Sequence, residues 1–580
     1  MPVSHHTSRR LTAWVSRLAW SSRLLQGAPH LAMACALGAL GALVALGFAA
    51  MLVLTERWLS GYGFDFSGGI ARLPWWQQVA LPAAGGLIAG LFLHWAIKLK
   101  ASRTAPTEYL EAIYARSSTL DARDAGLKAI SSFFSIVSGG SIGKEGAMVQ
   151  LAATASSLVS PALKLRGDTF RLGLCMAATG GLTAVYHTPI GAALFVAEIA
   201  LGGFELRRIS LLFISAATAS LIVVAMAGFA PLYPLAPDVV VLHPVLFAQV
   251  IVVGLCAGLA GAVLLWAVRY ASSGFRRVAP NVVLRMTLGG MAVGGFILIS
   301  PEVAGNGYGP IFALLSENIL PISVGLLLLL KIGATAVTVG SGAVGGLFTP
   351  ALMVGALTAA CVAPTLLTWS DTGTTVTLIA AGMAAALAAT TQAPLMATVV
   401  LIEMTQEAKL ALPLMLACAV AYSLSRVMGQ AGTYGVLSRY RELFDRRSAL
   451  PETRVQTVMA KPTGYARLGT PFGEVNAQAR MQRNRFVLLL DDAGRFHGAV
   501  SVHDVMAQPA HDLIDEAAVR SLLVPDFPIV TQNQNVIDVW DLIVASPADR
   551  VPVVNDMQQR IVVGTLQRQA LLARMKLLLG

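Results

Sequence analysis

Residues 138–150 read SGGSIGKEGAMVQ, and they place an adjacent lysine and glutamate, Lys144 and Glu145, between glycines in an otherwise apolar part of the chain. An ionised side chain at membrane depth is costly and marks a functional site by default. A phosphate-binding loop would need a Gly five residues before Gly143 and a Ser or Thr after the lysine, whereas this chain has Ser138 and Glu145 there. The stretch is therefore not predicted to bind phosphate.

The composition predicts a polytopic membrane protein that resides in a lipid bilayer. Of the 580 residues, 56% are hydrophobic and 13% are charged, and the mean hydropathy is +0.68. Soluble domains are roughly 45–50% apolar and about 25% charged. The five cysteines lie in apolar segments without metal-ligand spacing, so they are interpreted as small core residues, and no metal site is predicted.

The net charge of +11 reflects basic residues at the ends of apolar segments, as in 9–23, 98–103 and 439–447. This distribution is typical of the positive-inside bias and predicts that both termini are cytoplasmic. It does not indicate nucleic-acid binding. The apolar run from about 31 to 54 is long enough to span, so the N-terminus is not predicted to be a cleavable signal.

The chain divides into a basic N-terminal segment (1–29), a membrane domain (30–447) and a soluble C-terminal region. Full spans are predicted near 31–54, 76–98, 246–268 and 320–338. Shorter, glycine-punctuated segments are predicted near 124–137, 146–160, 172–186, 190–203 and 348–363. Short, interrupted segments in matched pairs are typical of broken helices that meet near the bilayer midplane.

One such matched pair is visible. The stretches HTPIGAALFVAEIA (187–200) and QAPLMATVVLIEMT (392–405) each place a glutamate, Glu198 or Glu403, nine residues after a proline. Both glutamates are expected to cap helices or to pair structurally. The same order at similar spacing predicts an internal repeat.

The predicted halves of the repeat are about 76–228 and 246–428, because GKEGAMVQ and GGLFTPALMVG lie at similar distances before the two matched stretches. Glu145 stands directly after a glycine and opens the apolar run AMVQLAATASSL, which places it at a helix N-terminus. That end carries about half a unit of positive charge and free N–H groups, which favour a carboxylate or a bound anion.

In the second half, SGAVGGLFTPAL turns through glycines and is predicted to start a helix near Leu347, without an acid. If both helix ends point at one place, several N–H groups converge there without a fixed positive charge. Such a site holds an anion weakly enough to release it, as conduction requires. Glu145 would occupy the site as a competing anion, and protonating it or swinging it away would free the site. Glu145 is therefore interpreted as a gate.

These motifs resemble the CLC family of chloride channels and transporters over most of the membrane domain, and the bacterial ClcB-type branch in particular. GKEGAMVQ is similar to the family signature G-[RK]-E-G-x-x-x-Q, GSGAVGGLFTP (340–350) to its GxFxP element, and AGTYGVLSRY (431–440) to its last membrane helix. The resemblance implies a gating role for Glu145. It also implies a set of anion-binding residues: Gly143, Lys144, Gly146, Gly346, Leu347, Phe348 and Tyr434.

The first anion motif of the family departs here. In place of Gly-Ser-Gly-Ile-Pro the chain has SRTAP (102–106), with Arg103 three residues before the proline and Thr104 beside it. Thr104 could supply the hydroxyl that the family serine supplies. Val344 also replaces a frequent proline of the second-half motif. Chloride is the expected anion, while nitrate or fluoride stays open.

A second departure concerns protons. Many family exchangers carry two consecutive glutamates after LF, of which the second relays protons, whereas here Glu198 is followed by Ile199. An apolar residue there is typical of channels and favours a channel-like mode. Proton-coupled exchange is the alternative, with Glu145 and Glu198 as its proton path.

Further residues keep alternative interpretations. Lys144 could attract anions or pair with Glu108 or Glu111. Lys331 is expected to lie in the membrane or near its surface and to snorkel. His187 is expected to form hydrogen bonds at a helix end.

The C-terminal region shows two units of one plan, 452–510 and 515–578, each with a short strand, a helix and two β-rich runs around a polar turn. This duplication resembles a tandem pair of CBS domains, which are cytoplasmic modules that are often regulatory and sometimes bind an adenosine nucleotide. Members that bind nucleotide often carry an Asp six residues after the strand glycine. Asp504 keeps that spacing, but Ala570 replaces it in the second unit.

The resemblance thus implies at most one nucleotide site, at Asp504, or a pair that only stabilises a dimer. It also implies an α-helical, polytopic fold with an inverted repeat of broken, tilted helices and an α+β cytoplasmic pair. A homodimer with one pore per subunit, in the bacterial inner membrane, is implied as well.

Three other classes of function are weaker. An intramembrane protease would need H-E-x-x-H or a serine with a histidine base, and neither occurs in the apolar region. A cation or magnesium transporter would need several acidic ligands along a pore, whereas the spans hold few acids. A pure sensor, with a silent membrane part, is the third. The chain is therefore predicted to be a transport protein and not an enzyme.

Overall fold

The fold is taken from a computed structural model of the chain. It describes residues 6–60, 66–101, 108–114, 120–228, 230–236, 240, 242–316, 322–366, 372–429, 432–433, 454–462, 465–468, 470, 486–501, 523–524, 527–545 and 550–567. The chain forms two compact units, Met1–Ser438 and Arg439–Gly580.

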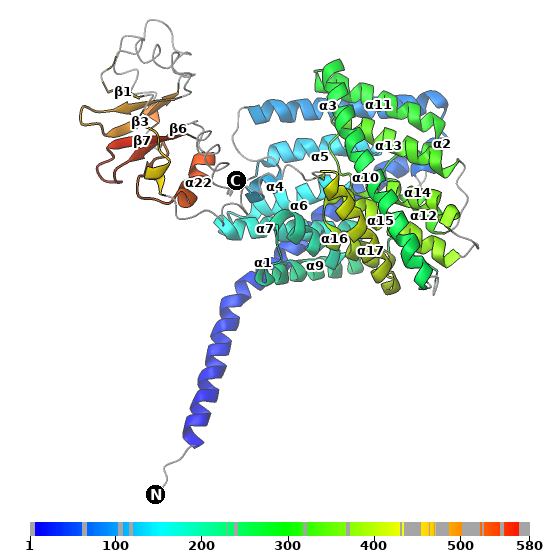
Figure 1. Cartoon of the computed structure of the whole chain (residues 1–580), viewed down its shortest axis with the longest axis horizontal. Coiled ribbons are helices and arrows are strands. Elements are labelled where there is room, and N and C mark those ends of the chain that lie inside the picture. The colour runs from blue at the N-terminus through cyan, green and yellow to red at the C-terminus, as the bar shows by residue number, and fades with distance from the viewer. Residues whose placement is uncertain are drawn as a thin grey trace. The chain divides into compact units, whose positions relative to one another are not determined.

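The first unit is helical (Figure 1). Its elements up to the middle of the unit are α1 (His6–Ser60), α2 (Phe66–Ala71), α3 (Trp75–Ala101), α4 (Tyr109–Tyr114), α5 (Ala122–Val137), α6 (Glu145–Val159), α7 (Gly167–Tyr186), α8 (Pro189–Phe195), the π-helix η1 (Val196–Leu201) and α9 (Leu206–Ala227). The remaining elements are α10 (Pro244–Val278), α11 (Val282–Ile299), η2 (Pro301–Val303), α12 (Tyr308–Leu315), α13 (Val324–Gly340), α14 (Phe348–Leu366), α15 (Thr372–Thr391), α16 (Pro394–Thr405), η3 (Ala408–Leu410) and α17 (Ala411–Val427).

Among the described residues, eight helices are long and apolar enough to cross a membrane. Two of the predicted segments change between the classes of full span and short segment. The span predicted near 320–338 is α13, a helix of only 17 residues, whereas α14, predicted as a short segment, has 19 residues and meets the criterion for a span. Both differences arise at ends where glycine and proline punctuation leaves the boundary open.

The element order repeats. The series α1, α3, α4, α5, α6, α7, α8, α9 corresponds in order and type to α10, α11, α12, α13, α14, α15, α16, α17. The first half of the repeat was predicted to begin near residue 76, which is the start of α3. In the observed order the first series begins with α1, whose counterpart in the second series is the long helix α10. The two series therefore build one membrane unit from two similar sets of helices.

Prolines set the breaks between helices at matched places. Pro189 and Pro394 stand at the first positions of α8 and α16, where the missing N–H costs nothing. Just before them, His187 and Gln392 adopt left-handed backbone angles, with φ of 56° and 61°, which end the preceding helices. His187 also forms a hydrogen bond through Nδ1 with the Ala230 carbonyl at 3.1 Å, as expected for a residue at a helix end.

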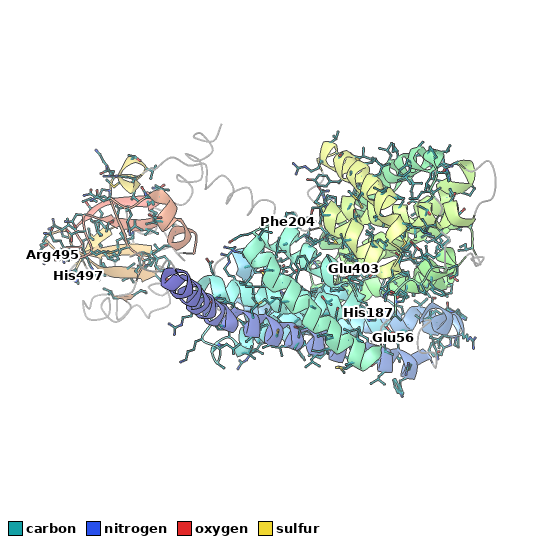
Figure 2. All side chains as sticks on the ribbon, turned by 90° about the horizontal axis from the view of Figure 1, so that it is seen from below. Glu56, His187, Phe204, Glu403, Arg495 and His497 are labelled. Atoms are coloured by element: carbon teal, nitrogen blue, oxygen red, sulfur yellow. The ribbon has the colours of Figure 1, made fainter. Side chains whose placement is uncertain are left out.

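The two matched glutamates join the series reciprocally. Glu403 of α16 accepts hydrogen bonds from the backbone N–H groups of Ile190 (2.9 Å) and Gly191 (2.7 Å) at the start of α8. Glu198 of η1 accepts one from the N–H of Met396 at the start of α16 (3.1 Å). The expected capping role is confirmed for both, and the caps cross between the halves. Glu403 lies where the blue-to-teal and green-to-yellow helices meet (Figure 2).

The interior of the membrane unit is built from small side chains. The apolar window of α15 is 94% buried, although a lipid-facing helix would expose one side. A Cβ on Gly355 of α14 would collide with the backbone of Gly382 in α15. The glycines let these two helices approach closely, as is usual where membrane helices pack.

The second unit is an α+β region. Its described elements are η4 (Val455–Thr457), β1 (Tyr465–Arg467), β2 (Phe486–Leu490), β3 (Phe496–Ser501), β4 (Leu523–Val524), β5 (Val530–Thr531), α22 (Val536–Ala545), β6 (Arg550–Val554) and β7 (Val562–Gln567). The sheets have the orders β1-β2-β3-β4 and β5-β6-β7. In both, a parallel pair (β1-β2 or β5-β6) is followed by an antiparallel hairpin (β2-β3 or β6-β7).

The two sheets touch through their hairpins. Arg495 bridges to Ile561, and the N–H of Phe496 donates to the carbonyl of Arg560 at 2.9 Å. Arg495 and His497 lie side by side on this unit in Figure 2. Asp491 at the same turn accepts from the Arg495 N–H, which is the main cause that holds the pKa of its carboxyl below the usual range. The predicted nucleotide residue Asp504 lies outside the described residues.

Candidate anion site

The site forms where the loop before α6 meets the loop before α14. Gly143 and Gly346 form an isolated antiparallel bridge, in which each N–H donates to the other carbonyl at 2.8 and 2.9 Å. This pair brings together two positions of the chain that are 203 residues apart. The two helix starts that the sequence predicted to converge are therefore joined by backbone hydrogen bonds.

Equivalent turns aim the two helix starts. The C-cap residues of α5 and α13 are Ser138 and Ser341. Each is followed by a glycine in the left-handed region, Gly139 with φ of 101° and Gly342 with φ of 113°. Glycine reaches these angles without the steric penalty that a Cβ would bring. The glycine clusters thus reverse the chain sharply and in the same way in both loops.

Glu145 is the first residue of α6, and its side chain crosses to the other helix. Its Oε1 accepts a hydrogen bond from the backbone N–H of Phe348, the first residue of α14, at 2.9 Å. Glu145 is 3% exposed, and its Oε2 has no hydrogen-bond partner among the described residues. The carboxylate therefore occupies the N-terminus of α14 as an anion would.

The glycines around the carboxylate make room for it. A Cβ on Gly143 or on Gly346 would collide with the Glu145 carboxylate. A Cβ on Gly146 would lie 3.2 Å from the carbonyl carbon of Gly345, so this glycine allows the two segments to approach. Leu347, which precedes α14, is buried with 7% of its surface exposed, whereas Gly146 on the other helix start is exposed.

Lys144 stands beside the gate candidate as the N-cap residue of α6, and its side chain forms no capping hydrogen bond. The acids that act electrostatically on its ammonium group are Glu56, near the end of α1, and Glu145. Glu56 is labelled in Figure 2. Sequence reasoning considered Glu108 and Glu111 as partners and did not anticipate Glu56, because α1 is distant from this loop in the sequence.

Tyr186, the last residue of α7, forms one wall of the site. Its ring stacks on the ring of Phe348 with centroids 4.5 Å apart and planes 23° apart. Its hydroxyl lies 3.0 Å from Oγ1 of Thr349 and within interaction range of the Glu145 carboxylate. Sequence reasoning missed Tyr186, since a single tyrosine before HTP gives no local signal of this contact.

A second tyrosine lies farther from the contact. Tyr233 is fully buried, its ring stacks on Tyr308 at 4.9 Å, and its hydroxyl has no hydrogen-bond partner among the described residues. The Tyr308 hydroxyl donates to the Leu232 carbonyl at 2.6 Å. Tyr233 lies in the loop between α9 and α10, and Tyr308 is the first residue of α12. No sequence pattern predicted that these two rings stack on each other.

Comparison with known proteins settles the family. Residues 85–426 match the family described as "Voltage gated chloride channel". The chain belongs to this family. A Ralstonia nicotianae protein described as a ClcB-like chloride channel protein is 38% identical over 420 residues, which cover 71% of this chain and 97% of that protein. The family that the motifs predicted is confirmed.

Two solved structures have the same fold. A slow cyanobacterial Cl⁻/H⁺ antiporter is 22% identical with a TM-score of 0.62, and the match covers 71% of this chain and 97% of that one. A eukaryotic CLC transporter is 16% identical with a TM-score of 0.57, covering 94% and 98%. Because the second unit is about a quarter of this chain, the latter match extends into it. The predicted CLC transporter fold, with a multi-pass membrane unit, is thereby confirmed.

Within this CLC fold, Lys331 differs from its expected placement. It is 0% exposed, and its Nζ donates to the carbonyls of Val303 and Gly305, each at 3.0 Å. The expected snorkelling is wrong, because the carbonyls beside a glycine-rich turn satisfy the ammonium group inside the protein. Apolar neighbours in GLLLLLK gave no indication of these partners.

Two of the predicted anion-site residues, Thr104 and Tyr434, lie outside the described residues. The described residue before Tyr434 is Thr433, whose N–H donates to the Thr390 carbonyl at the end of α15 at 2.7 Å. Within the described part of the CLC fold, the site thus consists of two joined helix starts, one carboxylate and a tyrosine. The backbone N–H groups and the tyrosine hydroxyl of this set are neutral donors that can bind an anion.

Proposed function

We propose that the chain transports chloride across the membrane and that Glu145 is its gate. The observation that supports this most strongly is the 2.9 Å hydrogen bond from the Phe348 N–H to the Glu145 carboxylate, which joins the two halves of the fold. A carboxylate that occupies a helix N-terminus competes with any small anion for the same donors. Chloride can bind there once Glu145 is protonated or moves away.

The proposed anion ligands are the backbone groups around this contact. Gly143, Gly146 and Gly346 leave space for an anion, because they have no side chains. The N–H group of Phe348 donates to the Glu145 carboxylate, and the N–H group of Leu347 is next to it in the chain. Helix ends provide partial charge and no full cation, so the anion binds weakly and leaves quickly. Lys144 is proposed to raise the local anion concentration. Thr104 and Tyr434 are also proposed as anion ligands, and this proposal is supported by their sequence motifs alone.

A channel-like mode is the first candidate. Ile199 is apolar and 8% exposed, and the neighbouring Glu198 is engaged at the start of α16 through Met396. A glutamate that caps a helix is poorly suited to exchange protons, because its charge is needed where it is. These two observations favour anion flow without obligatory proton flow.

Proton-coupled exchange is the second candidate. The similar cyanobacterial structure is that of a Cl⁻/H⁺ antiporter, so the shared fold is compatible with coupling. In that mode Glu145 would carry protons on the outer side and Glu198 would be part of the inner path. Glu198 would then have to release the N–H of Met396 in every cycle.

We also propose a homodimer with one pore per subunit, in the bacterial inner membrane, with 30–447 as the membrane domain. The repeated strand order of the C-terminal unit supports a CBS pair, 452–510 and 515–578, on the cytoplasmic side. An adenosine nucleotide at Asp504 is the ligand to test there.

The test is anion efflux from proteoliposomes under a chloride gradient, with chloride and pH recorded together. Wild type, Glu145→Gln and the control Glu205→Gln would be measured side by side, because Glu205 is an exposed acid paired with Arg208. Chloride efflux that changes in Glu145→Gln, and stays normal in Glu205→Gln, is expected.

Efflux without proton movement would establish the channel-like mode, whereas uphill proton movement that Glu145→Gln abolishes would establish exchange. The absence of chloride flux in all three proteins would overturn the proposed function.

A further inference from the structure

The side chain of Tyr186 is placed to reach the anion site, although the proposed gate does not use it. Tyr186 is 3% exposed, and its ring is held by stacking on Phe348, whose N–H holds Glu145. Because a stacked ring has little freedom, the hydroxyl is kept in one place. The tyrosine is thus tied to the residue that binds the carboxylate.

The hydroxyl of Tyr186 has bonding capacity to spare. It forms one hydrogen bond of 3.0 Å, with the hydroxyl of Thr349, in which either group can be the donor. A hydroxyl donates one proton and accepts two. When Thr349 donates to Tyr186, the tyrosine proton is free for a third group.

The group that lacks a partner is Oε2 of Glu145. This atom is buried and has no hydrogen-bond partner among the described residues. A buried carboxylate oxygen without a donor is costly, so a nearby hydroxyl that can turn its proton is well used there. The Tyr186 hydroxyl is within interaction range of this carboxylate.

We propose that the Tyr186 hydroxyl, oriented by Thr349, is a ligand of the anion site. It donates to the Glu145 carboxylate while the gate is closed and to the transported anion once the carboxylate has left. This inference rests on the proposed function and adds a specificity-determining hydroxyl to it. The chain of two hydroxyls, Thr349 to Tyr186 to the anion, strengthens the final donor.

The experiment measures chloride binding by calorimetry and chloride efflux on the full chain. Tyr186→Phe removes the hydroxyl and keeps the ring that stacks on Phe348. It would be made in wild type and in Glu145→Gln, which empties the site of its carboxylate. Tyr308→Phe is the matched control, because it removes another tyrosine hydroxyl whose partner is the Leu232 carbonyl.

In the Glu145→Gln background, loss of the hydroxyl is expected to weaken chloride binding about tenfold, the effect of one hydrogen bond to a charged group. In the chain that keeps Glu145, Tyr186→Phe removes a hydrogen-bond donor that stabilises the ionised carboxylate of Glu145. Protonation is then easier, and the midpoint of acid activation should move up by about one pH unit. Thr349→Val should cause a smaller change in the same direction.

Unchanged chloride affinity in Tyr186→Phe with Glu145→Gln would overturn the inference and leave the gate intact. An equal loss in Tyr308→Phe would also overturn it, because the effect would then not belong to the site. If Glu145→Gln itself neither binds nor conducts chloride, the proposed function fails, and the two failures are thereby distinguished.

Discussion

At the scale of single residues, the charge of Glu145 is compensated by partial charges. Its carboxylate receives the N–H of Phe348 at a helix start and lies beside glycines that leave space for it. A full cation in contact would bind an anion tightly and slow its release. The adjacent cation in the sequence, Lys144, is itself engaged electrostatically with Glu56. The site is therefore suited to weak, exchangeable binding.

Lys331 gives a prediction about stability. Lys331→Met should lower the free energy of unfolding by about 2 kcal/mol or more, because it leaves the buried carbonyls of Val303 and Gly305 without their donor. Lys331→Gln should lose less, since the amide still offers two N–H donors. Chemical unfolding in detergent, followed by tryptophan fluorescence, measures both.

If Lys331→Met were as stable as wild type, the two carbonyl contacts would not matter. If Lys331→Gln were as unstable as Lys331→Met, the charge of the ammonium group would matter more than its donors.

Sequence reasoning found the charged and glycine residues of the site and missed its aromatic wall. Glu145 was predicted at a helix start and is the first residue of α6, and the second start was expected near Leu347 and lies at Phe348. These residues carry local patterns. Tyr186 depends on a contact with Thr349, 163 residues away, for which a single sequence has no pattern.

At the scale of elements, the reciprocal caps hold the short helices α8 and α16 together. A helix of 7 residues such as α8 has little stability of its own. Its few backbone hydrogen bonds contribute less free energy than nucleation of the helix costs. Glu403 supplies acceptors for two of its free N–H groups, those of Ile190 and Gly191. The cap comes from the other half, so each half stabilises a helix of its counterpart.

Glu403→Gln should therefore lower the apparent free energy of unfolding by about 1–2 kcal/mol, because one charged acceptor pair is replaced by one neutral oxygen. Thermal unfolding in detergent measures the loss, and Glu205→Gln on the surface is the control. Equal melting of Glu403→Gln and the control would show that the cap adds nothing.

Gly346→Ala tests the contact between the two helix starts. Its Cβ would take the space of the Glu145 carboxylate, so both this carboxylate and chloride should be displaced, and chloride binding should weaken about tenfold. Gly126→Ala is the control, since a Cβ there has no atom within 4 Å. Wild-type chloride affinity in Gly346→Ala, measured by calorimetry, would contradict the placement of the anion.

Sequence patterns predicted helix starts better than helix lengths. The starts of α8 and α16 follow from Pro189 and Pro394, whose position is fixed by the missing N–H. The length of α13 was overestimated, because no charged residue separates its apolar run from the preceding residues 321–323. Composition alone does not separate a buried helix from a spanning one.

At the scale of the whole molecule, two similar series of helices and a duplicated C-terminal unit share one chain. The series α1 to α9 and α10 to α17 contribute one helix start each to the site, so neither half forms it alone. The order of the repeat could be predicted from the matched stretches, but the place where the halves touch could not. It depends on the Gly143–Gly346 bridge.

The distribution of basic residues predicts that both termini face the cytoplasm. A green fluorescent protein fused after Gly580 should fluoresce, and alkaline phosphatase at the same place should be inactive, because each folds on one side of the membrane only. Active phosphatase would contradict the orientation and would place the C-terminal unit outside.

Chloride binding measured by calorimetry at about pH 5 and about pH 8, in wild type and in Glu145→Gln, tests whether the Glu145 carboxylate competes with chloride. If the Glu145 carboxylate is the competing anion, wild type binds chloride about tenfold more tightly in acid, where the carboxyl is protonated. Glu145→Gln then binds tightly at both pH values. The same pH dependence in the two proteins would contradict the claim that Glu145 occupies the anion site.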